Sequence, residues 1–243
     1  MNLECLPNET LLDLFEYFNG DDLLRAFYGL NLRFNLILYK QFRTYRFHFN
    51  SISKRILDMI CQQHLPFIAD RVIDLSLSDG DETPEQINLF LSYISSFNQF
   101  THLQSLTLFH LNSHKTLLIL LDECRHLNNL MYLNITSWYL SKDQVNCQVI
   151  VDNIWSLPKL IKCDLNIDIN KHNFLCLPTI ISLSLESVTT HRSDLKMNQI
   201  NQLLEYTPRL KHLLTSLAIT NDDYIPSPLS MLIDFENLLL FFL

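Results

Sequence analysis

A recurring pattern of apolar positions organises the chain from residue 72 onward. Apolar side chains stand in the order apolar, two others, apolar, one other, apolar, as in Val72, Leu75 and Leu77. Alternation at the last two positions is typical of a short strand, whose side chains point in turn to opposite faces. The other copies are Leu103–Leu106–Leu108, Leu130–Leu133–Ile135, Leu160–Cys163–Leu165, Ile180–Leu183–Leu185, Phe235–Leu238–Leu240 and a weaker Leu210–Leu213.

The spacing of these copies indicates a repeat architecture. Between the middle positions the steps are 31, 27, 30, 20, 30 and 25 residues, close to the period of about 20–29 residues of leucine-rich repeats. Helical spacing of apolar residues separates the strands, as in Ile87, Phe90, Leu91 and Ile94. Strands alternating with helices at this period predict a solenoid with strands on its concave side. A doubly wound α/β domain fits the same alternation and is the alternative fold.

The first forty residues follow a helical pattern instead. Pro7 and Glu9 favour a helix start, because proline suits the first turn and an acid there is stabilised by the helix dipole. Leu11, Leu12, Phe15 and Phe18 then form an apolar stripe.

A second and a third helix are predicted in the same region. Gly20 is expected to end the first helix in a left-handed cap, and Asp21 to cap a second helix that carries Leu23, Leu24 and Phe27. A third apolar set begins at Leu32. Three short helices form a core that is too small to be stable alone, which favours packing against a partner.

These N-terminal residues resemble the F-box, the module that docks the Skp adaptor of cullin–RING ubiquitin ligases. The resemblance covers about residues 3–42 and is carried by the leucine–proline–x–glutamate start and the apolar spacing after it. Thr10, Asn31 and Phe34 depart from the family, which usually has an aliphatic residue, cysteine and tryptophan there. The residues that the resemblance assigns to adaptor docking are Leu6, Pro7, Glu9, Leu11, Leu12, Phe15, Phe18, Leu23 and Leu24.

The resemblance also implies a fold and a function. We expect an α/β protein with an N-terminal three-helix F-box-like module (1–45), a linker helix and first turn (46–70) and an irregular, horseshoe-like leucine-rich-repeat solenoid (71–243). F-box proteins with such repeats are substrate-recognition subunits of ubiquitin ligases. The chain would therefore be a non-catalytic adaptor that needs no cofactor and whose ubiquitin transfer is performed by other subunits.

The protein target is expected to lie on the outward strand positions between the repeat leucines. These side chains point away from the core by the period-2 rule and are free to recognise a partner. They are Gln104, Thr107, Met131, Tyr132, Asn134, Lys162, Asp164, Ser182 and Ser184. An F-box-like scaffold that does not dock the adaptor, and a hydrolase on a doubly wound sheet, are the alternative functions.

Composition narrows the other function classes. Three glycines disfavour a Gly-rich phosphate loop, and a net charge of −8 disfavours nucleic acid despite the basic and aromatic segment 40–48. His110, His114 and His126 lack the spacing of metal ligands. We read 40–48 as part of a linker helix and expect neither an enzyme nor a metal site.

The ends and the cysteines bear on compartment and association. The first residues lack the features of a secretory signal and no apolar run is long enough to span a membrane, so we expect the cytoplasm, the nucleus or both, with six reduced cysteines. The apolar run 238–243 ends the chain as a strand without a polar cap. Such an end predicts self-association through the C-terminal strand.

Overall fold

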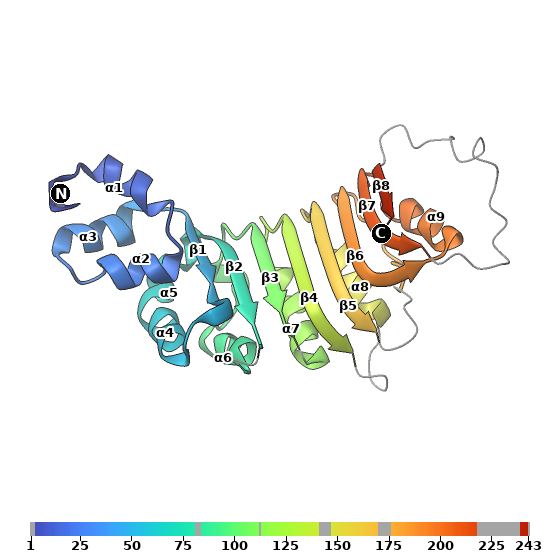
Figure 1. Ribbon diagram of the computed structural model, residues 1–243, viewed down its shortest axis with the longest axis horizontal. Helices are drawn as coiled ribbons and strands as arrows, with labels where there is room; N and C mark the ends of the chain where they lie inside the picture. Colours follow the sequence, from blue (N-terminus) through green and yellow to red (C-terminus); the bar gives the residue numbers. More distant parts are fainter. Residues whose placement is uncertain are drawn as a thin grey trace.

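The computed structural model describes residues 3–80, 84–111, 113–140, 147–169, 176–217 and 239–242. Helices gather at the N-terminal end, and strands follow side by side along an elongated, curved molecule (Figure 1). All eight strands of the described residues belong to one sheet, in which every neighbouring pair is parallel. Their bounds are β1 Tyr45–His48, β2 Val72–Ser78, β3 Ser105–Phe109, β4 Tyr132–Leu140, β5 Lys162–Ile169, β6 Ser187–Leu195, β7 His212–Leu217 and β8 Leu239–Phe242.

Helices fill the connections between these strands. Figure 1 shows α4 to α8 on one side of the sheet. Their bounds are α1 Asn8–Phe15, α2 Gly20–Phe27, α3 Leu32–Leu36, α4 Lys54–Met59, α5 Leu65–Ile68, α6 Gln86–Tyr93, α7 His114–Cys124, α8 Cys147–Trp155 and α9 Met197–Glu205. Wider π-helical turns extend α3 over Ile37–Gln41 and α4 over Ile60–His64, and short 3-10 turns lie at Leu3–Cys5, Phe49–Ser51, Ala69–Arg71 and Phe97–Gln99. Within the described ranges, no helix is long and apolar enough to cross a membrane.

The predicted fold class is wrong. We expected a three-helix module followed by a separate solenoid, whereas one all-parallel sheet in an α/β arrangement runs through the described chain. Its first strand, β1, lies before residue 71, and five α-helices rather than three precede β2. The alternative prediction shares the single parallel sheet, but a doubly wound sheet reverses its strand order at one point. Here the strand order follows the chain order.

A series of aromatic rings explains why the N-terminal helices merge with the sheet. Phe15 of α1 contacts Phe27 of α2 and Phe42, with ring centroids 4.8 and 6.0 Å apart. Phe42 in turn contacts Tyr45, which stacks on Phe47 in β1. The small helical core that the sequence indicated is thus completed by the first strand, because burying these rings removes a large apolar area from water.

Gly20 lies where helix α2 packs against strand β1. The sequence predicted a left-handed cap there, but Gly20 is the first residue of α2 and does not have a positive φ. A Cβ atom at this position would lie 2.5 Å from the ring of Phe47. The glycine therefore permits the close approach of α2 to β1, and the interpretation as a helix breaker is wrong.

The predicted linker helix is also wrong over its first part. Residues 45–48 of the basic and aromatic segment form strand β1, with Tyr45 and Phe47 buried and Arg46 and His48 exposed. This alternation is a strand pattern, which aromatic and β-branched residues favour. The helix that follows begins only at Lys54.

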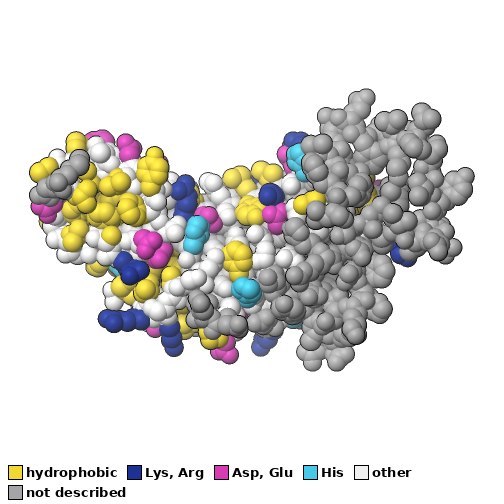
Figure 2. Space-filling model, in the orientation of Figure 1, with side chains coloured by type: hydrophobic (Ala, Val, Ile, Leu, Met, Phe, Trp, Pro, Cys, Tyr) yellow, Lys and Arg dark blue, Asp and Glu magenta, His cyan; other side chains and the backbone are white. Residues whose placement is uncertain are grey.

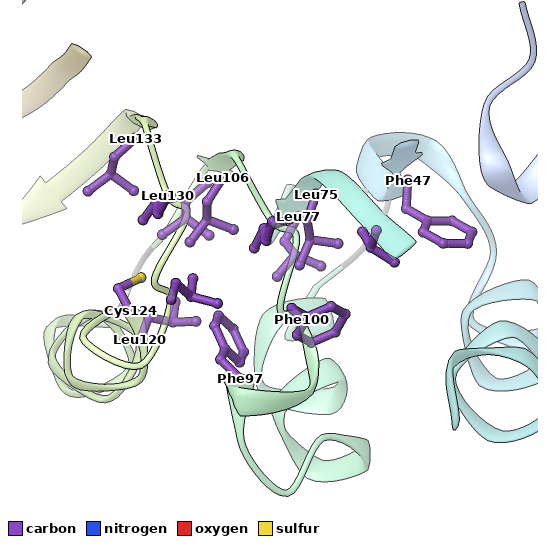
Figure 3. Packing of buried hydrophobic residues seen from close by; sticks show 14 of the residues in the cluster. Phe47, Leu75, Leu77, Phe97, Phe100, Leu106, Leu120, Cys124, Leu130 and Leu133 are labelled. Atoms are coloured by element: carbon purple, nitrogen blue, oxygen red, sulfur yellow. The ribbon is translucent and has the colours of Figure 1, made fainter. Parts of the chain in front are cut away.

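The interior is built by the repeat positions. Leu75, Leu106 and Leu133 pair across β2, β3 and β4 and are fully buried. Figure 3 shows these leucines above Phe97, Phe100 and residues of α7, which close the core from the helical side.

Two predicted copies of the repeat have the wrong register. No strand forms over 180–185, where Leu183 is 70% exposed; β6 begins at Ser187 and places Val188 beside Cys163 and Leu213. In the last copy Leu240, rather than Leu238, pairs with Leu213. The remainder of the C-terminal run, residues 238 and 243, lies outside the described residues.

Candidate functional site

The N-terminal helices carry a cluster of large apolar side chains on their surface. Tyr17 is 88% exposed and Leu32 is 75% exposed, whereas side chains that hold a fold together are mostly buried. Figure 2 shows hydrophobic side chains gathered over this end of the molecule. We call this set the N-terminal apolar patch; its members are Leu3, Tyr17, Phe18, Tyr28, Leu30, Leu32 and Leu36.

Hydrogen bonds hold the segments of the patch in place. Arg33 of α3 donates to the backbone oxygens of Glu4 and Leu6 and to Oδ1 of Asn8. Asn31 accepts from the backbone N–H of Phe34 at 3.1 Å, which caps the start of α3. The chain before α1 is therefore bound to α3, and the patch forms on a defined surface rather than on a loose end.

The residues predicted to dock the adaptor divide into three groups by their burial. Leu11, Phe15, Leu23 and Leu24 are buried in the core. The half-buried pair Leu6 and Leu12 packs against that core. The exposed members are Pro7, Glu9 and Phe18. Most of the predicted residues therefore hold the helices together, whereas the sequence interpretation missed Tyr17, Leu30, Leu32 and Leu36 as surface contacts.

A second surface lies on the face of the sheet opposite the core. On β4, Leu133 and Ile135 are buried in the core. Neighbouring side chains of a strand point to opposite faces, so Tyr132 and Asn134, and the residues paired with them on the other strands, point to the second face. The first row across the sheet is Asp74, Ser105, Tyr132, Lys162, Ser187 and His212; the second is Ser76, Thr107, Asn134, Asp164, Thr189 and Leu214.

Tyr132, Lys162 and Asp164 form a cluster at the centre of this face. The hydroxyl of Tyr132 donates to Oδ2 of Asp164 at 2.8 Å, and Nζ of Lys162 lies 3.3 Å from the same oxygen. The ammonium group also lies 5.1 Å from the centre of the Tyr132 ring. Burial and the neighbouring carboxylate raise the pKa of Tyr132 to about 12. The phenol therefore stays protonated at neutral pH and acts as a hydrogen-bond donor.

Oxygen atoms around this cluster are poorly satisfied. Within the described ranges, buried oxygens of Asn134, Thr136, Asp164 and Asn166 accept no hydrogen bond. An unsatisfied buried acceptor costs about 1–3 kcal/mol, and such groups in native proteins call for an explanation in strain or function. All four lie on β4 and β5, the strands that also carry Tyr132 and Lys162.

A rim of exposed residues precedes the strands. The carbonyl oxygen of Gln104 accepts from the N–H groups of Met131 and Tyr132, and that of Met131 accepts from Ile161 and Lys162. The same arrangement continues through Ile161 and Glu186. This ladder fixes the backbone and presents Met131 and Ile161, two exposed apolar side chains, next to the Tyr132 cluster.

The sheet brings most of the predicted target residues together. Thr107, Tyr132, Asn134, Lys162 and Asp164 lie on neighbouring strands, although Thr107 is buried. Gln104 and Met131 belong to the rim.

Ser182 and Ser184 are placed elsewhere, because the strand predicted there does not form. Ser182 is buried, and its N–H donates to the carbonyl of Tyr206. Its side-chain oxygen accepts from the N–H of Leu185. Ser184 is half-buried and donates to the carbonyl of Leu157. Both residues therefore join the segment before β6 to neighbouring segments, Ser182 to the end of α9 and Ser184 to the segment after α8.

Comparison with models of known protein families and with curated proteins gives no significant match for this chain. The part of the chain that the structure describes contains no group of three or more His, Cys, Asp and Glu side chains placed to hold a metal ion. Since no family model matches, the resemblance to the F-box rests on the residues between about 3 and 42.

Proposed function

We propose that this protein is a non-catalytic scaffold that binds other proteins through two separate surfaces. The N-terminal apolar patch is the observation that carries the proposal. Monomeric proteins rarely expose contiguous apolar surface of this kind, and where they do it commonly marks an interaction site. The large, rigid side chains of Tyr17 and Phe18 are of the type that dominates the binding energy of protein interfaces.

The sheet face supplies the second surface. Aromatic, cationic and apolar side chains lie next to one another there, as in Tyr132, Lys162 and Met131. Tyrosine and methionine are enriched at protein interfaces, and charged groups such as that of Lys162 are typical of the polar rim around them. In this scheme the patch holds one protein and the sheet face another, and the scaffold works in the cytoplasm or nucleus.

Docking of a Skp-type adaptor on the patch is the narrower second candidate. The F-box resemblance favours it, and so does the position of the patch on the helices that carry the resemblance. An adaptor bound there would make the chain a substrate receptor of a ubiquitin ligase, with its target on the sheet face. The scaffold without an adaptor requires only that some protein covers the patch.

Introducing negative charges into the N-terminal apolar patch tests whether it docks a Skp-type adaptor. Replacing both Leu30 and Leu32 with aspartate is expected to remove adaptor binding, since each carboxylate would have to be desolvated in an apolar interface at a cost of several kcal/mol. Both side chains are exposed, so the helices should keep their circular dichroism spectrum and melting temperature. Isothermal titration calorimetry with a purified Skp-type adaptor measures the effect.

Ile119→Asp provides the matched control. Ile119 is an exposed apolar residue of α7, far along the chain from the patch. Binding by the unmodified chain and by this control, but not by the double variant, supports adaptor docking. No binding by the unmodified chain contradicts adaptor docking and leaves the scaffold proposal, and equal binding by all three chains contradicts the role of the patch.

A further inference from the structure

Two cysteines from separate segments meet beside α8. Cys147 is the first residue of α8, and Cys176 lies in the segment that leads toward β6. Their thiols are joined by a side-chain hydrogen bond, and both side chains are half-buried and free. A reagent of small size can therefore reach a pair of thiols that the fold already holds in contact.

Other hydrogen bonds keep the two segments together. Nε2 of Gln148, the residue after Cys147, donates to the carbonyl of Leu177, the residue after Cys176, at 2.7 Å. One turn further along α8, the carboxylate of Asp152 accepts from the N–H of Thr179 at 2.7 Å and from its hydroxyl at 2.8 Å. The contact between the thiols is thus part of a continuous polar attachment of segment 176–179 to the first turns of α8.

The surroundings make the two thiols unequal. The S–H group of Cys176 donates to Cys147 and, despite partial burial, lowers the pKa of Cys147 to about 7. The same hydrogen bond raises the pKa of Cys176. At neutral pH about half of a thiol with this pKa is ionised, against a few per cent of an ordinary thiol. Cys147 is therefore the nucleophile of the pair and Cys176 the resolving thiol.

The remaining described cysteines lack this combination. Cys61, Cys124 and Cys163 are buried, and burial raises the pKa of each of them. Cys5 is exposed. Buried, protonated thiols react slowly with oxidants, because the thiolate is the reactive form.

We propose that Cys147 and Cys176 form a modification site that reacts with a hydroperoxide and closes to a disulfide. The Cys147 thiolate attacks one oxygen of hydrogen peroxide, so that an S–O bond forms, the O–O bond breaks and hydroxide leaves and is protonated to water. Sγ of Cys176 then attacks the sulfenic sulfur. The S–S bond forms, the S–O bond breaks, and the departing hydroxyl group takes the Cys176 proton to leave as water. In total, two thiols and one peroxide give one disulfide and two waters.

The disulfide changes the chain in a defined place. It closes a loop that contains the whole of β5, the strand that carries Lys162 and Asp164. Cross-linking removes conformational freedom from the unfolded chain, so the oxidised protein should unfold at a higher denaturant concentration than the reduced protein. This inference concerns the thiol pair alone and holds whether or not the sheet face binds a target.

Peroxide treatment of the folded, full-length chain tests the proposal. We expect a peptide in which Cys147 and Cys176 are linked, detected by mass spectrometry after alkylation and proteolysis, and the loss of two free thiols. Cys147 should react several-fold faster than the exposed Cys5 at pH 7, and its rate should rise with pH through about 7, as the ionised fraction does.

Serine variants separate the roles of the two thiols. Cys176→Ser should accumulate a sulfenic acid at position 147 that dimedone traps, whereas Cys147→Ser should leave Cys176 reduced. Cys5→Ser is the control and should form the disulfide normally. Two results with the unmodified chain would contradict the proposal: the absence of the linked peptide, or oxidation of Cys5 before Cys147.

Discussion

Replacing both Tyr132 and Lys162 with alanine is expected to weaken binding of the protein held on the sheet face by about 30-fold or more. A central tyrosine of an interface commonly contributes at least about 2 kcal/mol, which corresponds to that factor. The two side chains lie together at the centre of the face and share Asp164 as a partner. Surface plasmon resonance with the protein that the unmodified chain captures would measure the change.

A second pair of substitutions controls for general effects on the surface. Ile119 and Val149 are exposed on α7 and α8, on the helical side of the molecule. Replacing both with alanine should leave the affinity within about twofold, because surface changes remote from an interface contribute little. Full binding by the Tyr132 and Lys162 variant would mean that the target does not use this face.

Trp155→Ala is expected to cause the largest loss of stability. Trp155 is buried at the end of α8, and Nε1 donates to the hydroxyl of Thr207, 52 residues further along the chain, at 2.9 Å. Truncation removes the ring and leaves a cavity, which together cost about 3–5 kcal/mol for an aromatic residue. Urea unfolding followed by circular dichroism measures the free energy of unfolding.

Trp155→Phe distinguishes packing from hydrogen bonding at this position. Phenylalanine keeps most of the apolar area but removes the N–H donor, and the buried Thr207 hydroxyl then lacks that partner at a cost of about 1–3 kcal/mol. The loss should therefore be smaller than for alanine. A free energy of unfolding that changes by less than about 1 kcal/mol in both variants would show that Trp155 does not connect α8 with the segment after α9.

The strands of the middle repeats could be predicted because their motif is regular. Leu106 and Leu133, which the pattern placed at the middle of two strands, pair with each other and are buried. Strand β6 was missed because Val188 and Thr190 occupy its inward positions, while Leu183 gives a false apolar match on the surface. Even spacing was the signal that could have found it, since Val188 lies 25 residues after Cys163 and 25 before Leu213.

The single sheet could not be predicted from the N-terminal pattern. Residues 45–48 are too short for periodicity to show a strand, and the contact between Gly20 and Phe47 depends on tertiary packing. Apolar spacing likewise cannot distinguish Leu24, which is buried, from Leu32, which is exposed, because both belong to helical stripes. The contact between Cys147 and Cys176 depends on the attachment of segment 176–179 to α8, which no short motif announces.

Site-specific photo-crosslinking tests most directly the claim that the sheet face holds a protein. A benzoylphenylalanine side chain is placed in turn at Met131 and Ile161 on the rim and at Ile119 and Val149 on the helices, four apolar positions with similar exposure of 37, 40, 45 and 41%. Each full-length variant is irradiated in extract of the source cells, and crosslinked proteins are identified by mass spectrometry. The account predicts that both rim positions crosslink the same protein, that excess unmodified chain competes with it, and that neither helix position does so. Crosslinking of that protein from the helix positions, with none from the rim, would contradict the account.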